Sequence, residues 1–110
     1  MNTLVIDDVR TFNFDADYAR NSYEGLRALK TKVYDEVWLD HDLGMLDGSD
    51  DTIESVVNYL EYLAWRRTPY PAKRIVIHTA NPKGRERMVQ VLEKYYPIEV
   101  VWAPDYMRTS

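Results

Sequence analysis

Short apolar runs that end in polar residues constrain the fold of this chain more than any other feature. Residues 4–7, 36–40, 73–79 and 98–102 are rich in Val, Ile and Trp and too short for helices, so we expect four strands. A weaker strand is expected over 17–20. Because hydrophobic residues are nearly continuous within the four runs, the pattern predicts a sheet that is covered on both faces.

Segments with helical spacing lie between these strands. Ser22 is expected to cap a short helix, and Asp51 to cap a longer one with Glu54 as its capping-box partner. A third helix is expected to begin at Asn81-Pro82. Strands that alternate with helices predict right-handed crossovers in a mostly parallel α/β sheet, with the site at the carboxyl ends of the strands.

Between the first two strands there is too little chain, and too little helical pattern, for a crossover helix. We expect residues 9–16 to form an irregular loop along one wall of the site. The chain of 110 residues is long enough for one domain with one core, so residues 1–110 are predicted to form a single domain.

Composition narrows the kinds of function. The chain has no secretory signal and no apolar run near the ~20 residues of a membrane span, which predicts a cytoplasmic protein without membrane contact. It has no cysteine, which leaves oxygen or imidazole ligands for any metal. The net charge is −4 and no basic stripe occurs, so there is no strong signal for nucleic-acid binding. Acidic residues concentrate in 1–55 and basic residues in 56–110. This division suits a site whose acidic side holds a cation and whose basic side faces an anion.

Four aspartates stand at the ends of two predicted strands: Asp7, Asp8, Asp40 and Asp42. Each one alone is more often a turn or cap residue than a ligand. If the two strands are neighbours, however, the four carboxylates crowd together, and a cation relieves the crowding. Hard oxygen ligands favour Mg²⁺ or Mn²⁺, so we predict a divalent metal site.

Both histidines, His41 and His78, lie next to these strand ends. A neutral imidazole can move a proton to or from water or a leaving oxygen, which makes both residues catalytic candidates with Asp40. The alternative for His78 is a hydrogen-bonded core residue that points away from the crevice.

Four residues are candidates for binding a phosphate. Arg10 follows the first acidic pair and Arg20 follows the second strand, where guanidinium groups can hold an anion. Thr79 and Asn81 stand at the start of a predicted helix, whose free N–H groups favour anions.

The order of these acidic residues resembles that of response-regulator receiver domains. In those domains the acidic pair and the third-strand aspartate hold Mg²⁺, and that aspartate accepts a phosphoryl group, which implies these roles for Asp7, Asp8 and Asp40. The receiver lysine before a proline is absent, because this chain has Ala103-Pro104 there. This difference argues against ordinary phosphorelay signalling.

Three fragments are similar to a narrower family, the cyclic-phosphate processing receiver domains of bacterial and phage proteins. They are Asp7-Asp8-Val9-Arg10, Leu39-Asp40-His41-Asp42-Leu43-Gly44 and His78-Thr79-Ala80-Asn81-Pro82-Lys83-Gly84. This resemblance implies a three-layer, flavodoxin-like α/β domain with a five-stranded sheet and a reduced set of helices. Two departures are the absence of a proline soon after Arg10 and the presence of Thr79 where serine is commoner.

The expected function is that of a divalent-metal-dependent phosphoesterase-like protein that acts on a cyclic phosphate of a nucleotide or nucleotide-derived small molecule. One alternative is a non-catalytic receiver-like module that binds a protein partner or a nucleotide. A second is a phosphoacceptor with Asp40 as nucleophile. A third is a metal-dependent nuclease resembling Toprim domains, which is disfavoured because Asp7 stands where those domains have glutamate.

Overall fold

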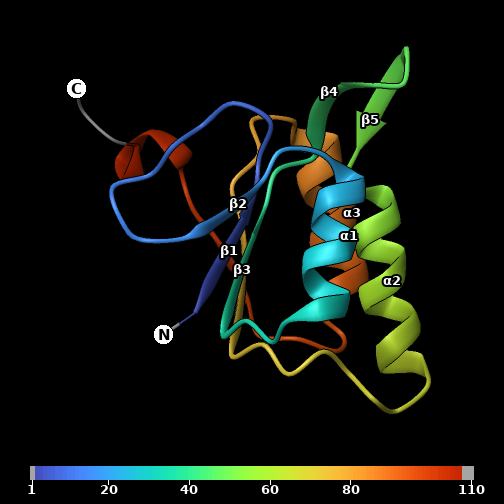
Figure 1. The fold of residues 1–110 in the computed structure, drawn as a ribbon. Coiled ribbons are helices and arrows are strands. Elements are labelled where there is room, and N and C mark those ends of the chain that lie inside the picture. Colours follow the sequence, from blue (N-terminus) through green and yellow to red (C-terminus); the bar gives the residue numbers. More distant parts are fainter. Residues whose placement is uncertain (1, 108–110) are drawn as a thin grey trace.

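The computed structural model describes residues 2–107, which form a five-stranded parallel sheet and a separate hairpin (Figure 1). The strand order is β2-β1-β3-β6-β7, and every pairing between neighbours is parallel. The bounds are Thr3–Ile6 for β1, Asp17–Ala19 for β2, Glu36–Leu39 for β3, Arg74–Ile77 for β6 and Ile98–Val100 for β7. All five predicted strands are therefore confirmed.

Three helices cover one face of the sheet: α1 (Ser22–Thr31), α2 (Glu54–Trp65) and α3 (Pro82–Leu92) (Figure 1). Each helix lies in a connection between two strands, and the three connections run across the sheet in the same direction. Right-handed crossovers then place all three helices on the same side. The larger core lies between them and the sheet, where Leu29, Val57 and Met88 are buried against strand residues. None of the described helices is long and apolar enough to cross a bilayer.

The connection from β1 to β2 runs in the opposite direction, so the same rule sends it across the other face. It carries no helix, as the sequence predicted. Phe12 of this loop is fully buried against Trp38, and the short 3₁₀ helix η1 (Ala103–Tyr106) completes the cover (Figure 1). The fold is thus receiver-like and flavodoxin-like, with loop and 3₁₀ helix in place of α-helices on one face.

A row of ion pairs crosses the same face of the sheet, next to the aromatic cluster of Phe12 and Trp38. Arg74 of β6 forms ion pairs with Glu36 of β3, at 2.9 Å, and with Glu99 of β7. Glu36 also accepts a hydrogen bond from the indole of Trp38, at 3.1 Å. These partly exposed ion pairs lie on the part of the sheet that none of the described α-helices covers.

The hairpin of β4 (Asp42–Leu46) and β5 (Ser49–Thr52) was missed from the sequence. Its two turn residues, Asp47 and Gly48, have φ values of 52° and 82°. Positive φ at both central positions matches the twist of the two strands, and Asp-Gly is a strong signal for such a turn. The Asp47-Gly48 pair could therefore have predicted this hairpin from the sequence.

Two predicted helix caps are wrong, although both helices form. Asp51 lies in β5 and accepts hydrogen bonds from the backbone N–H and hydroxyl of Ser22, at 2.8 and 2.6 Å. Helix α2 consequently begins later, with Ile53 at the N-cap position. Asn21, not Ser22, caps α1 by accepting from the N–H of Glu24 at 2.8 Å.

Candidate functional site

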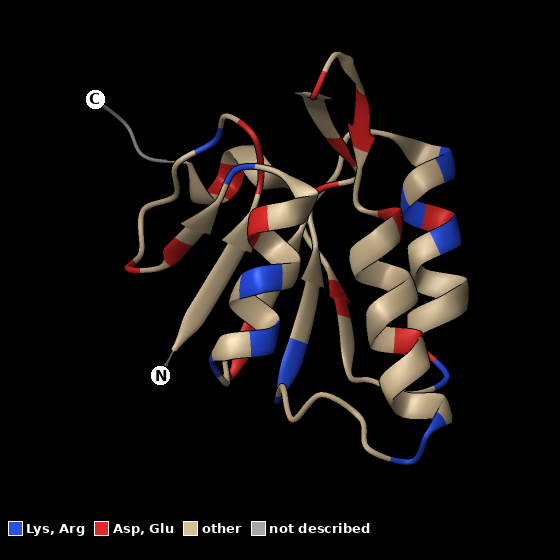
Figure 2. Ribbon diagram, turned by 45° about the vertical axis from the view of Figure 1, so that its right-hand side comes forward, with Lys and Arg blue, Asp and Glu red and all other residues tan. Residues whose placement is uncertain are grey.

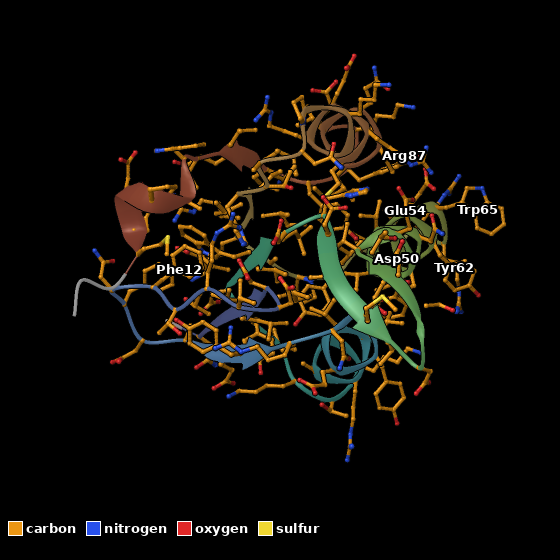
Figure 3. All side chains as sticks on the ribbon, turned by 90° about the horizontal axis from the view of Figure 1, so that it is seen from above. Phe12, Asp50, Glu54, Tyr62, Trp65 and Arg87 are labelled. Carbon is orange, nitrogen blue, oxygen red and sulfur yellow. The ribbon has the colours of Figure 1, made fainter. Side chains whose placement is uncertain are left out.

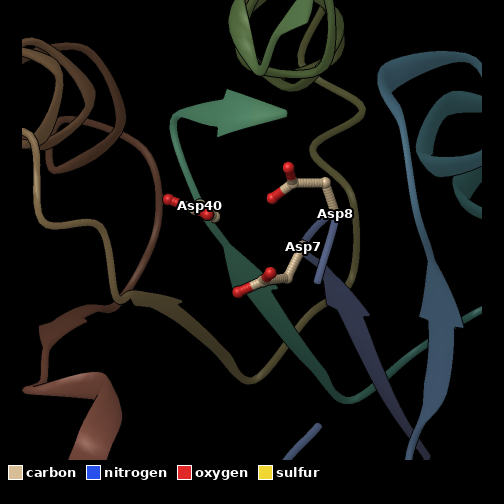
Figure 4. Close-up of side chains that lie close together, drawn as sticks. All are labelled: Asp7, Asp8 and Asp40. Carbon is tan, nitrogen blue, oxygen red and sulfur yellow. The ribbon is translucent and has the colours of Figure 1, made fainter. Parts of the chain in front are cut away.

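Strand pairing brings Asp7, Asp8 and Asp40 together (Figure 4). Asp40 follows β3 and donates its backbone N–H to the carbonyl of Ile6, at 3.1 Å, so it lies beside the end of β1. One carboxylate oxygen from each aspartate lies within 4.8 Å of the others. Connections leave β1 and β3 in opposite directions, and such a switch point is where open α/β sheets bind ligands.

Asp7 is fully buried and accepts four hydrogen bonds. Its Oδ1 accepts from the N–H groups of Val9 and Arg10, both at 2.9 Å, and its Oδ2 accepts from Arg10 Nη1 at 3.2 Å and His78 Nε2 at 3.1 Å. Burial alone would raise the pKa of Asp7, but the hydrogen bonds from His78 and the two N–H groups outweigh it. The pKa therefore lies well below its ordinary value of 3.8, and Asp7 is ionised at neutral pH.

Replacing Asp7 by asparagine should destabilise the fold by about 2 kcal/mol at pH 7, because donors that now face a carboxylate would face an amide NH₂. A lowered carboxyl pKa contributes stability that is present above its unfolded value and lost as pH falls towards its folded value. The difference between wild type and Asp7→Asn should therefore shrink below about pH 4. Urea unfolding at pH 7 and pH 3 measures it. An equal difference at both values would contradict this account.

The pKa of Asp40 is raised, in contrast to that of Asp7. Burial and the neighbouring charge of Asp7 raise the pKa of Asp40, and His78, Thr79 and Arg10 oppose this only in part. Among residues 2–107, no side chain donates a hydrogen bond to the half-buried carboxylate of Asp8. Crowded carboxylates of this kind, with one left without a donor, fit a hard divalent cation.

His78 is buried and points towards Asp7. Because a carboxylate can only accept, His78 Nε2 donates to it, and the ring also packs edge-on against Phe12 with centroids 5.3 Å apart. The other ring nitrogen, Nδ1, is buried without a hydrogen-bond partner in the described part of the chain. The hydrogen bond to Asp7 therefore places a proton on Nε2, whereas a proton on Nδ1 would have no acceptor there. His78 is thus well placed to orient Asp7.

His41 lies on the helix-covered side of the sheet. Its Nδ1 is 3.0 Å from Asp42 Oδ1, and its Nε2 is 3.7 Å from Glu54 Oε1. Asn81 caps α3 by accepting from the N–H of Gly84 at 3.0 Å, and donates to Asp42 Oδ2 at 3.2 Å. The carboxylate of Asp42 is therefore engaged by His41 and Asn81, outside the group formed by the other three aspartates.

Glu54 and Gly84 also lie next to His41, although neither was among the predicted site residues. Glu54 accepts from Arg87 Nε at 2.8 Å, and Figure 3 shows the two side chains next to each other, far from Phe12. A Cβ atom on Gly84 would lie 2.4 Å from Cγ of His41. Both residues were missed because the Asp47-Gly48 turn was not recognised. The hairpin that this turn closes brings the chain back, so that α2 starts beside His41.

Gly84→Ala should therefore displace His41. Alanine normally stabilises a helix by about 1 kcal/mol relative to glycine, but overpacking here should reverse the sign and cost about 1–3 kcal/mol. In a His41→Ala background the same substitution should become neutral or stabilising. Urea unfolding of the four proteins of this double-mutant cycle measures the coupling. Additive effects would mean that the imidazole does not occupy the space above Gly84.

The four predicted phosphate ligands fall into two groups. Arg10 contacts Asp7 and Asp40, and Thr79 lies close enough to Asp40 to oppose the rise in the pKa of its carboxyl group, so both residues lie at the acidic cluster. Arg20 instead donates to the backbone carbonyls of Asp7 and Arg10, at 3.2 and 2.7 Å, and thereby holds the loop. Asn81 caps α3, as described above.

The three aspartates thus converge at the carboxyl ends of neighbouring parallel strands. The sequence profile of one family matches residues 2–94, which include every side chain of this candidate site. That family is described as the cyclic-phosphate processing receiver domain. The chain belongs to this family.

Among solved structures, this cyclic-phosphate processing receiver domain is similar to a response regulator protein from Burkholderia pseudomallei, solved with a phosphorylated aspartic acid, a calcium ion and citrate. The TM-score is 0.56 and the identity 19%, over 94% of this chain and 62% of that protein. This likeness supports the shared fold. No curated protein matches the chain.

In this receiver domain the predicted separation of charge is visible around the site (Figure 2). The hairpin carries several acidic residues, and the first turns of α3 carry Lys83, Arg85 and Arg87. The ion pair of Glu54 with Arg87 joins the two regions. Ala103, which stands where receivers have lysine, is buried at the start of η1, and the cationic side chain next to Asp40 is Arg10.

Proposed function

We propose that this domain is a divalent-metal-dependent phosphoesterase that opens a cyclic phosphate of a nucleotide or nucleotide-derived small molecule. The observation that carries the proposal is the convergence of three carboxylates and Arg10 at the switch point of the sheet, in a member of a cyclic-phosphate processing family. The carboxylates suit a cation and Arg10 suits the anionic phosphate, and a histidine beside the strand ends supplies the proton donor that such a reaction also needs.

Asp8 and Asp40 would hold the cation, with Asp7 as a third ligand. All the donors are carboxylate oxygens, which suits Mg²⁺ or Mn²⁺. The bound cation would supply positive charge beside the phosphoryl group and make water more acidic. Asp42 can contribute through its main chain, because its carboxylate is held by His41 and Asn81.

His41 is the better proton donor of the two histidines. The Nε2–H of His78 is directed at Asp7 and its side chain is not exposed, whereas the His41 side chain is 13% exposed. In ring opening, a water oxygen bonds to phosphorus and one bond from phosphorus to a ribose oxygen breaks. His41 would give a proton to that ribose oxygen and regain one from the attacking water. Arg10 and Thr79 would orient the phosphate, while Arg20 and Asn81 would position the loop and α3.

Incubation of the purified protein with Mn²⁺ or Mg²⁺ and a panel of 2′,3′-cyclic and 3′,5′-cyclic nucleotides tests the reaction. We expect conversion of at least one member to a nucleoside monophosphate, as followed by phosphorus NMR, and none in Asp40→Asn. A ligand that is retained without turnover would favour the non-catalytic module. Turnover that survives in Asp40→Asn would contradict the proposed site.

A further inference from the structure

Arg10 stands where a cation shared by the three aspartates would bind. Its Nη1 is 3.2 Å from Asp7 Oδ2 and 3.3 Å from Asp40 Oδ2, so a single nitrogen bridges two of the three carboxylates. The third, Asp8, contributes an oxygen to the same cluster and forms no ion pair among residues 2–107. The guanidinium thus supplies positive charge at the centre of the group.

While Arg10 stays there, Asp7 has no acceptor site to spare. A carboxylate has about four lone-pair positions, and Asp7 uses four, for two N–H groups, His78 and Arg10. Only the contact with Arg10 comes from a side chain at the surface of the cluster. A cation that uses all three aspartates must therefore take the place of Arg10 Nη1.

The guanidinium is held loosely enough to be displaced. Both of its carboxylate contacts use Nη1 and are longer than the 2.7–2.9 Å typical of charged hydrogen bonds. No other nitrogen of this guanidinium forms a hydrogen bond within the described part of the chain, and the side chain is 22% exposed. The backbone N–H of Arg10 is bonded to Asp7 Oδ1 at 2.9 Å, so the residue stays at the site when its side chain turns outward.

We propose that Arg10 is a built-in counter-ion, which neutralises Asp7 and Asp40 in the cation-free protein and is released by the divalent cation to bind the phosphate of the ligand. The inference rests on the proposed function, because it takes the three aspartates as the cation site. Cation binding and phosphate binding would consequently be coupled. The cation frees the Arg10 guanidinium to bind phosphate, and by linkage phosphate raises the affinity for the cation by the same factor.

Removing the guanidinium should therefore strengthen cation binding. We expect Arg10→Gln to bind Mn²⁺ at least about tenfold more tightly than wild type in calorimetric titrations, equivalent to about 1.4 kcal/mol. Arg10→Lys, which keeps the charge, should stay nearer to wild type. Arg27→Gln, which removes the same charge from α1, should change the affinity less than about twofold.

Inorganic phosphate serves as the anion probe. In wild type, saturating Mg²⁺ should tighten phosphate binding several-fold, and this enhancement should be smaller in Arg10→Gln, where only the cation itself attracts the anion. A third measurement needs no variant: in wild type, the NMR signal of the Arg10 guanidinium should move on addition of Mg²⁺ as its contacts with Asp7 and Asp40 break.

The outcomes separate this inference from the proposed function. If wild type and Arg10→Gln both bind Mn²⁺ with the same affinity, or the variant binds more weakly, Arg10 does not compete with the cation and the inference is wrong while the metal site stands. An Arg10 signal that Mg²⁺ leaves unchanged overturns it in the same way. If no protein binds Mn²⁺, both the inference and the proposed metal site are wrong.

Discussion

Asp40→Asn is expected to lose catalytic turnover by at least about 100-fold while its cation-free fold becomes more stable than wild type. The loss follows because Asp40 is one of three carboxylates proposed to hold the cation on which the reaction depends. The gain follows because burial and the charge of Asp7 raise the pKa of Asp40, so its ionised form is unfavourable in the folded protein. A neutral amide removes that penalty at pH 7.

Added Mg²⁺ should reverse the order of stability. A ligand at 100 times its Kd stabilises a protein by about 2.7 kcal/mol, which corresponds to a Tm increase on the order of 10 °C for a chain of this size. Wild type should show this increase and Asp40→Asn should not. Thermal unfolding with and without Mg²⁺, together with the cyclic-nucleotide assay, measures both effects.

Asp42→Asn is the matched control, since Asp42 is two residues away and its carboxylate is outside the group of three. It should keep the Mg²⁺-dependent increase in Tm. Its turnover should fall only to the extent that the His41 imidazole loses its contact with the Asp42 carboxylate. If Asp42→Asn abolishes the increase and Asp40→Asn does not, the metal ligands are assigned to the wrong aspartates.

Phe12→Ala is expected to destabilise the protein by about 3–5 kcal/mol, a large part of the stability of a small domain. The Phe12 ring is fully buried where a crossover helix would otherwise cover the sheet, and it stacks on Phe14 and tilts against Trp38 at centroid distances of 5.5 and 5.4 Å. It also touches the ring of His78. Its loss should leave a cavity under the loop that carries Arg10.

Urea unfolding measures this cost, and Phe14→Ala is its control. Phe14 belongs to the same loop but is only partly buried, so its truncation should cost roughly 1–2 kcal/mol. Because Phe12 supports His78, Phe12→Ala should also weaken Mn²⁺ binding more than Phe14→Ala does. A cost for Phe12→Ala no larger than about 1 kcal/mol would show that the loop does not act as the third layer of the fold.

Local pattern was sufficient for most of the architecture. The strands are short, apolar and β-branched, and α3 begins at Asn81-Pro82 as its cap signal indicated. The helix starts near Ser22 and Asp51 were displaced because side chains that can cap a helix can also hydrogen-bond elsewhere. Asp51 does so with Ser22, across 29 positions of sequence.

Part of the candidate site could likewise be predicted from the sequence, and part could not. Its residue types and their positions at strand ends could be read from the sequence, because parallel strands bring their carboxyl ends to one edge. The direction of each side chain could not. His41 and His78 both follow strands, yet one packs on Gly84 beneath the helices and the other packs on Phe12 beneath the loop. Sequence spacing does not reveal which neighbour a side chain will meet.

The sequence by itself determined the alternation of strands and helices and the acidic ends of β1 and β3, since these depend on hydrophobic period and on residues close together in the chain. Only the tertiary structure decided that Arg10 bridges Asp7 and Asp40, that His78 donates to Asp7, and that the Asp42 carboxylate lies apart. Those contacts join segments up to 71 positions apart, and their geometry is fixed by packing of the whole fold rather than by any local preference.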